Sequence, residues 1–288
     1  MAKSGNLVYG ILTFLVIAAI SGCSHNDKLA EQDPTVQPSE PFAFPEEPAL
    51  NPTLTQSNET LVSEPPSKPV QPIEDPDEPA LKLKSIGINL GYYDPTTSTA
   101  GDLKFTKSKF MFGIIFSDYG YFIPGEQSAG GKDKFNPQPT FTAPMGTKVM
   151  SLVDGVVTKV PLLYSGDYSI HVATNPQSRW IYETEHVINP LVKVGDEVKA
   201  GQVIAEVSPH NKDANGGFGI VEIGILKGGN PPQHVCPFAY LDESIREDIQ
   251  KKLTSLYSSW EKYRGDSSLY DENALKQPGC LMLDPIDG

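Results

Sequence analysis

The stretch that decides the fold is Leu191-Val-Lys-Val-Gly-Asp-Glu-Val-Lys-Ala-Gly-Gln-Val-Ile-Ala-Glu-Val207. Apolar residues recur at every second position, at Val192 and Val194 and again at Val203, Ala205 and Val207, which is the period of a half-buried strand. Gly195 and Gly201 interrupt the alternation where the chain must turn. The stretch therefore predicts two short strands joined by a turn.

Glycines also interrupt the strand pattern on both sides of this stretch. Short strands with glycine at their corners are typical of a small antiparallel β-barrel or sandwich, which we expect over residues 136–230. We expect the core strands at 147–151, 155–160, 168–173, 180–187, 191–194, 203–207 and 218–226.

Two further regions complete this mainly β fold. Residues 83–135 are an expected N-terminal β extension, with strands in the alternating segment 81–90 and in the apolar run 109–116. The glycine-rich segment 125–133 is an expected mobile loop. Residues 231–288 hold one C-terminal α-helix and an irregular tail.

The helix is expected over residues 241–263. Asp242 is a suitable N-cap residue, and Gly265 ends the helical pattern. The apolar side chains recur at helical spacing, so this face is expected to pack on the barrel, and docking of a partner protein is the alternative. This face consists of Ile245, Ile249, Leu253, Leu256, Tyr257, Trp260 and Tyr263.

Residues 1–22 have the features of an export signal. Lys3 precedes an apolar run, 7–20, that is too short to span a membrane comfortably. The sequence Ile20-Ser-Gly-Cys23 resembles a bacterial lipobox, which implies that Cys23 is lipidated and anchors the protein in a membrane. Ser24 resembles the Gram-negative signal for the outer membrane, facing the periplasm. A plain signal peptide with an accidental cysteine is the alternative.

Residues 23–82 have the composition of a disordered tether. Residues 24–80 contain 12 prolines and 12 acidic residues against 2 lysines, and aromatic residues are rare. This segment holds most of the net charge of −13, so the remaining chain is nearly neutral. That distribution argues against a nucleic-acid-binding surface.

Cys236 and Cys280 are the two other cysteines. An exported chain meets an oxidising compartment, so we expect them to form a disulfide. Closing a loop of about 44 residues contributes roughly 4 kcal/mol in the chain-entropy model. A metal site is the weaker alternative, because two thiols alone do not complete a zinc shell.

Four blocks of the chain have a characteristic order and spacing. They are Phe141-Thr-Ala-Pro144-Met-Gly146-Thr147, Asp154-Gly155-Val156-Val157, Tyr182 with His186, and Val192-Lys-Val-Gly195-Asp-Glu-Val-Lys-Ala-Gly201-Gln202-Val-Ile. Together they resemble the lysostaphin/LytM-type zinc endopeptidases, which cut peptidoglycan cross-bridges. The resemblance covers about a third of the chain and implies the duplicated hybrid motif barrel of that family.

The zinc ligands of the family are missing from this sequence. The resemblance places them at Asn136 and Thr140, where relatives carry His-x-x-x-Asp, and at Ile220, where relatives carry the second histidine of His-x-His. Zinc needs nitrogen, sulfur or carboxylate donors, which these side chains do not supply. The resemblance therefore implies a degenerate member without a zinc cofactor.

His186 matches a histidine that stands beside the metal in active relatives and helps to stabilise the transition state. Without a metal it has no activated water to assist. We expect His186 to line a retained groove with Glu222, Trp180, Tyr182 and Phe218, where these side chains contact glycan or peptide. Buried wall and core positions are the alternative. The expected rims are 125–133 and 211–217.

Other side chains offer ways to rebuild a site. Strand alternation puts Glu183 and Glu185 on one face and His186 on the other. We expect the face with the two glutamates to be solvated, and acid–base work by this pair is the alternative. The donors that we consider for a rearranged metal site are Glu183, Glu185, His186, Glu222, His171, His210 and His234.

Three functions compete on these observations. The favoured one is a cell-envelope lipoprotein whose inactive peptidase-like domain binds peptidoglycan or a partner cell-wall hydrolase. The second is an active zinc endopeptidase with a rearranged site, which would bind one zinc per chain. The third is a biotinyl/lipoyl-type or adaptor module, but the chain lacks a Met-Lys-Met hairpin and long heptad helices.

Overall fold

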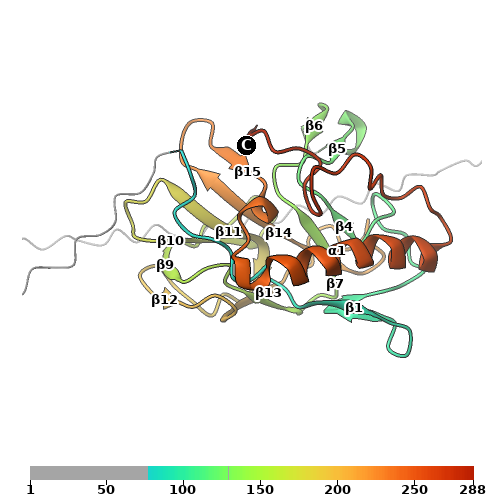
Figure 1. Cartoon of the computed structure of the whole chain (residues 1–288). Coiled ribbons are helices and arrows are strands. Elements are labelled where there is room, and N and C mark those ends of the chain that lie inside the picture. Colours follow the sequence, from blue (N-terminus) through green and yellow to red (C-terminus); the bar gives the residue numbers. More distant parts are fainter. Residues whose placement is uncertain (1–76, 129) are drawn as a thin grey trace, which may run out of the picture. The chain divides into compact units, whose positions relative to one another are not determined.

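The computed structural model describes residues 77–128 and 130–288, which lie in the structural unit Ser67–Gly288 (Figure 1). The expected export signal, the lipidation site at Cys23 and nearly all of the expected tether lie outside the described residues. Within the described residues, no helix combines the length and the apolar character that a membrane span requires.

Most of the strands belong to one antiparallel sheet. These strands are β4 (Phe116–Ser117), β7 (Thr140–Ala143), β8 (Lys148–Met150), β9 (Gly155–Lys159), β10 (Tyr168–Ala173), β11 (Trp180–Ile188), β12 (Glu197–Val198), β13 (Val203–Val207), β14 (Gly219–Lys227), β15 (Gln233–Val235) and β16 (Ile286–Asp287). The main path runs β12-β9-β10-β11-β14-β15-β16. In addition, β13 pairs with β11 and β8, and β7 pairs with β14 and β4. The mainly β fold is therefore confirmed.

The centre of the sheet is the pair β11 and β14, and β11 changes partner at His186. Before this residue β11 pairs with β14, with Glu185 opposite Glu222, and after it Val187 and Ile188 pair with β13. His186 has a left-handed backbone, with a φ of 59°, and the register toward β10 also shifts here. This irregularity lets one strand serve two parts of a curled sheet.

The core strands follow the sequence pattern closely. The bounds of β10 and β13 are those expected, and β8, β9, β11 and β14 differ from expectation by one or two residues at their ends. The strand expected at 191–194 is wrong, because the chain turns there and Asp196 Oδ2 accepts a hydrogen bond from Lys193 N at 3.0 Å. Strand β12 forms beyond that turn instead.

The N-terminal extension pairs less than expected. It contains the small sheet of β1 (Leu90–Asp94), β2 (Thr99–Gly101) and β3 (Leu103–Lys104), and the hairpin of β5 (Phe122–Ile123) and β6 (Lys134–Phe135). The strands expected in 81–90 and 109–116 are wrong except at Leu90 and Phe116. Phe116 and Ser117 form β4, which pairs with β7, so the extension is part of the main sheet.

The first described residues are held against the sheet. The Tyr182 hydroxyl donates to Leu81 O at 2.8 Å and accepts from Leu81 N at 2.5 Å. Farther along, Leu83 N donates to Tyr240 O at 2.9 Å. These contacts fix the chain to β11 before residue 83, where the extension was expected to begin.

The helix α1 (Glu243–Arg264) follows the short 3-10 helix η2 (Pro237–Tyr240). The Asp242 side chain caps it by accepting from Ser244 N at 3.0 Å, and Gly265 ends it with a φ of 77°. Both helix ends are as the sequence predicts.

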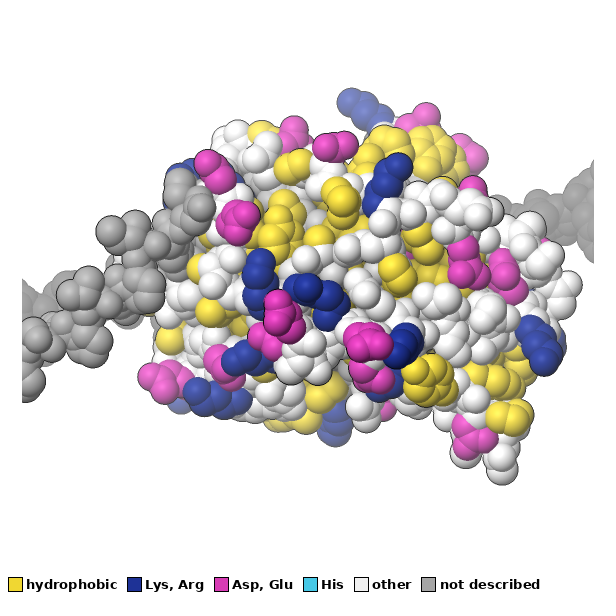
Figure 2. Space-filling model, in the orientation of Figure 1, with side chains coloured by type: hydrophobic (Ala, Val, Ile, Leu, Met, Phe, Trp, Pro, Cys, Tyr) yellow, Lys and Arg dark blue, Asp and Glu magenta, His cyan; other side chains and the backbone are white. Residues whose placement is uncertain are grey.

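The apolar face of α1 packs mainly on the N-terminal extension, which differs from the expected contact with the barrel. Trp260 is fully buried, stacks on Phe110 at 5.3 Å between ring centroids, and donates from Nε1 to Gly113 O at 2.9 Å. The outward face carries ion pairs, and blue and magenta side chains mix across the centre of Figure 2. The helix therefore has a structural role.

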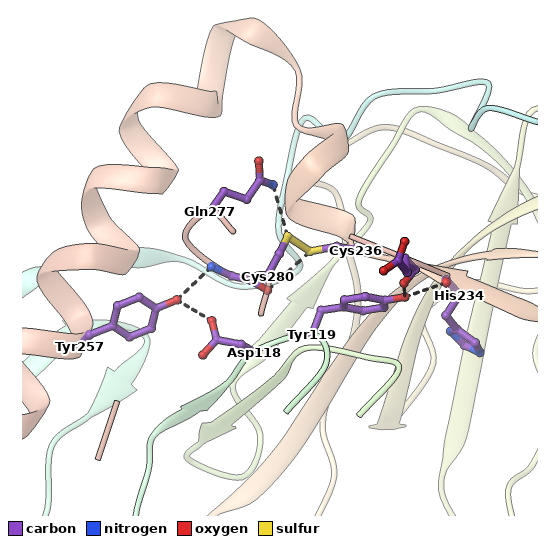
Figure 3. The surroundings of a disulfide bond; sticks show 9 residues. Asp118, Tyr119, His234, Cys236, Tyr257, Gln277 and Cys280 are labelled. Atoms are coloured by element: carbon purple, nitrogen blue, oxygen red, sulfur yellow. Dashed lines mark hydrogen bonds between the residues drawn. A yellow bond between two sulfur atoms is a disulfide. The ribbon is translucent and has the colours of Figure 1, made fainter. Parts of the chain in front are cut away.

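The disulfide between Cys236 and Cys280 is formed and lies beside α1 (Figure 3). Next to it, the Tyr257 hydroxyl donates to Asp118 Oδ1 at 2.6 Å and accepts from Gly279 N at 2.9 Å. The disulfide and this network together join the C-terminal tail, the helix and the extension.

Candidate binding groove

A groove of about 770 Å³ crosses the sheet near the partner change of β11. Its floor is made by β7, β11 and β14, and its rims come from the segment around the 3-10 helix η1 (Gly125–Gln127) and from 210–215, so both expected rims are confirmed. The lining residues used below are Met111, Ile114, Ile123, Glu126, Lys134, Asn136, Gln138, Thr140, Tyr164, Glu185, His186, His210, Ile220 and Glu222.

The structure brings Asn136, Thr140 and Ile220 together on the groove wall. Asn136 Nδ2 donates to Thr140 Oγ1 at 3.2 Å, and this hydroxyl lies 3.2 Å from Glu222 Oε1. The amide and the hydroxyl are neutral groups already engaged with neighbours, and Ile220 has no donor atom. These residues do not fit the zinc that the resemblance implies at these positions.

His186 is 5% exposed and is held by Asp167 from outside the strand. Its Nδ1 lies 3.1 Å from Asp167 Oδ2, and Ser208 Oγ donates to the same oxygen at 2.5 Å. The His210 ring stacks on His186 at 3.8 Å between centroids. Burial and the neighbouring His210 lower the pKa of His186 to about 4, so this ring is neutral at pH 7.

Glu183 and Glu185 are held together by Gln138 and are not on a solvated face, so that expectation is wrong. Gln138 Nε2 donates to Glu183 Oε2 at 2.9 Å and to Glu185 Oε2 at 3.0 Å. Burial opposes ionisation of Glu183, but hydrogen bonds from His171 and Ser169 outweigh it and lower its pKa. Burial and the charge of Glu183 raise the pKa of Glu185 to about 7.

Glu222 faces His186 across the groove floor. The two groups approach to 4.0 Å between Glu222 Oε2 and His186 Nε2. Burial and the charge of Glu185 raise the pKa of Glu222 to about 8. Strand alternation predicts Glu185 and His186 on opposite faces, but both line the groove, because the left-handed backbone at His186 breaks the alternation.

One group of side chains has the spacing of a metal site. Donor atoms of Asp167, His186 and His210 all lie within 4.8 Å of one another. However, both oxygens of Asp167 already accept hydrogen bonds, from Ser208 and from Ser165. The two imidazole rings lie nearly parallel, at 11°, so their lone pairs do not converge on one point. Metal binding here would require both rings to reorient.

Several predicted site residues lie elsewhere. Trp180 and Tyr182 are buried in the core, and Phe218 packs on Phe110, so none of the three lines the groove and the core alternative holds for them. His171 does not line the groove, and its Nε2 lies within hydrogen-bond distance of Glu183 Oε1, at 2.8 Å. His234 lies on β15, where its carbonyl oxygen accepts a hydrogen bond from the Tyr119 hydroxyl at 2.9 Å, and it does not line the groove.

Sequence reasoning missed Asp167 and Gln138, which organise the floor. Both are distant in sequence from their partners: Asp167 is 19 residues from His186, and Gln138 is 45 and 47 residues from the two glutamates. Gln138 lies just before the Phe141 block, and this proximity is the one signal that could have drawn attention to it.

Comparison with protein families adds to this geometry. Residues 138–231 of the 288 match the family model for Peptidase family M23. The chain carries an M23 peptidase domain. The matched residues contain the strands β7, β11 and β14 that form the groove floor. A comparison with curated proteins finds no match for this chain.

Three of the similar solved structures match this chain over most of their own length. A mutant catalytic domain of the M23 protein EnpA from Enterococcus faecalis is 25% identical, with 42% of this chain and 85% of that chain covered and a TM-score of 0.31. LytU is 24% identical, with 47% and 83% covered and a TM-score of 0.32. The catalytic domain of lysostaphin from Staphylococcus simulans is 22% identical, with 41% and 84% covered and a TM-score of 0.32.

Proposed function

We propose that the M23 domain of this chain binds peptidoglycan in its groove without hydrolysing it. The observation that carries the proposal is the replacement of all three zinc positions by Asn136, Thr140 and Ile220 in a groove that is otherwise kept. Metal-dependent hydrolysis needs an ion that activates water and polarises the peptide carbonyl. Side chains without suitable donors leave recognition as the activity that the groove supports.

The proposal extends to the compartment of the protein. The sequence up to Cys23 resembles a lipoprotein signal, and Ser24 resembles the outer-membrane sorting signal. A lipid anchor followed by a proline-rich, acidic tether would give the domain reach toward the cell wall. Palmitate labelling of the wild-type chain and of Cys23→Ser tests this, since the label is expected in the wild type alone.

The first experiment compares binding and cleavage on purified sacculi. We expect the full chain to sediment with sacculi and to release no soluble fragments, with or without added zinc. Cleavage by zinc-loaded protein contradicts the proposal. Absence of sedimentation also contradicts wall binding and would direct attention to a partner hydrolase.

A rebuilt site tests whether the three positions are those of the lost ligands. The triple variant Asn136→His, Thr140→Asp and Ile220→His supplies the donors that the family uses. We expect it to bind one zinc per chain by elemental analysis, whereas the wild type binds substoichiometric zinc. A folded triple variant that binds no zinc, checked by circular dichroism, would show that the positions are misassigned.

A second candidate function is an active zinc endopeptidase with a rearranged site. The grouping of Asp167, His186 and His210 within 4.8 Å favours it. It requires stoichiometric zinc in wild-type protein, and loss of that zinc in His210→Ala. The biotinyl/lipoyl-type alternative has no such support, and the family match favours the M23 assignment over it.

A further inference from the structure

The groove floor contains two hydrogen-bonding groups, the His186 imidazole and the Glu222 carboxyl, that face each other without a direct hydrogen bond. Asp167 accepts the hydrogen bond at Nδ1 of His186, which places the proton on Nδ1 and leaves Nε2 as an acceptor. His186 Nε2 lies 4.0 Å from Glu222 Oε2, which is too long for a hydrogen bond. Among the described residues, no side chain forms a hydrogen bond with this nitrogen, although His186 is only 5% exposed and lines the groove.

A third acceptor lies beside this pair. Glu185 is the register partner of Glu222 on the neighbouring strand and also lines the groove. Its Oε2 accepts one hydrogen bond from Gln138, which leaves its other oxygen for a ligand. The two carboxyl groups disfavour each other's charge, so a positive ligand between them relieves the repulsion.

Part of the groove lining is apolar. Met111, Ile114, Ile123 and Ile220 line the groove next to the acidic floor. Lys134 is the one cationic side chain among the described lining residues, and Glu126 adds a further acidic group at the rim. An apolar wall that ends in acceptors is complementary to an aliphatic chain that ends in a cation.

We propose that this groove binds a primary ammonium group at the end of an aliphatic side chain, with His186 Nε2, Glu222 and Glu185 accepting its three hydrogen bonds. An ammonium group carries three donors and no acceptor. This inference rests on the proposed function, because it names the feature of a wall peptide that the groove recognises: its amine-bearing side chain.

His186 Nε2 and Glu222 Oε2 lie 4.0 Å apart, which is within the reach of one shared ammonium group. Donors that share one zinc at about 2.1 Å lie no more than about 4.2 Å apart, whereas acceptors of one ammonium at about 2.8 Å lie up to about 5.6 Å apart. The group of described donors with all distances within 4.8 Å is Asp167, His186 and His210, and it includes neither glutamate.

The direct test uses two small probes that differ only in the amine. Nα-acetyl-lysine methylamide carries the ammonium group, and Nα-acetyl-norleucine methylamide has the same aliphatic chain without it. We expect the full chain to bind the lysine probe at least about 10-fold more tightly by NMR titration. Equal binding of the two probes, or binding of neither, overturns the inference.

Matched variants locate the probe. Glu222→Gln and Glu185→Gln keep the shape of the floor and are expected to weaken binding of the lysine probe at least about 10-fold, while Glu197→Gln, at an exposed position on β12, leaves it unchanged. Thermal unfolding establishes that each variant is folded. Unchanged binding in both floor variants overturns the assignment, as does stoichiometric zinc that is lost in His210→Ala and blocks the probe.

A sacculus experiment separates this inference from the proposed function. Native sacculi are compared with sacculi whose free amines have been acetylated. Weaker sedimentation with the acetylated material supports the inference, and equal sedimentation overturns it while wall binding stands. Binding of the lysine probe without sedimentation on either material supports amine recognition and overturns wall binding.

Discussion

The helix side and the groove side of this domain bury polar groups in opposite ways. On the helix side, Trp260 Nε1 reaches the carbonyl of Gly113, and Asp118 accepts a hydrogen bond from Tyr257. On the groove side, Glu185, His186 and Glu222 bring acceptors together with too few donors. Buried polar groups normally find partners, so the first arrangement is that of a stabilising core.

The difference separates stability from function within one small domain. The buried carboxyl groups of Glu185 and Glu222 cost stability, and they lie where a ligand can satisfy them. The helix side carries the aromatic packing and the disulfide that offset this cost. Substitutions on the helix side should therefore change stability first, and substitutions in the groove should change binding first.

The largest effect is expected from Trp260→Ala. The side chain is fully buried against Phe105 and Phe110, so its removal leaves a cavity and an unpaired carbonyl at Gly113. We expect a loss of about 4 to 5 kcal/mol in the free energy of unfolding, measured in urea. Ser258→Ala, exposed on the same helix, is the control, and a similar loss there would contradict the contrast.

Removal of the disulfide ranks second. Cys236→Ala with Cys280→Ala opens a loop with a sequence separation of 44 residues. The chain-entropy model gives a loss of about 4 kcal/mol as the upper estimate. Urea unfolding measures it, and the folded fraction is expected to bind the lysine probe as the wild type does. Loss of probe binding in folded protein would show that the two sides are coupled.

The third prediction concerns pH and Asp118. Burial raises its pKa from 3.8 to about 6, so the folded state favours the protonated form. Its stabilising contribution is complete below pH 4 and is lost as the pH rises through 6, by up to about 3 kcal/mol. Asp118→Asn mimics the protonated group, keeps an acceptor for Tyr257, and should flatten the fall in stability between pH 4 and 7. The same slope in variant and wild type would exclude Asp118 as its source.

The smallest stability effect is expected in the groove, and its sign is opposite. Glu222→Gln removes a carboxyl group that is buried beside Glu185, so we expect a gain of about 1 kcal/mol at pH 7. Thermal unfolding and the probe titration, run on the same sample, measure both consequences. A clear loss of stability would place Glu222 among the structural residues.

Regular elements could be predicted from the sequence because local patterns determine them. Alternation located β10 and β13, and the caps at Asp242 and Gly265 located α1. The run 109–116 has the composition of a strand, yet Phe110 packs against Trp260 and not against a strand partner. Tertiary packing there outweighs local propensity.

The groove could be predicted only in part. The family resemblance located His186, Asn136, Thr140 and the position of Ile220, but a pattern of residues does not show which carboxyl groups a fold buries. Glu183 and Glu185 have the pattern of a solvated strand face, but both are hydrogen-bonded to Gln138, which is distant in sequence. The backbone conformation of His186 is equally invisible in the sequence.

The two hydrogen bonds between Tyr182 and Leu81 have a mechanical consequence. They join the point where the described chain enters the domain to the strand that carries Glu185 and His186 only a few residues farther on. Tension applied to the chain upstream would therefore reach β14, through the ion pair of Asp77 with Lys227, and β11 before it reached the helix or the disulfide. The amine-binding groove would be the first part of the domain to register a pull.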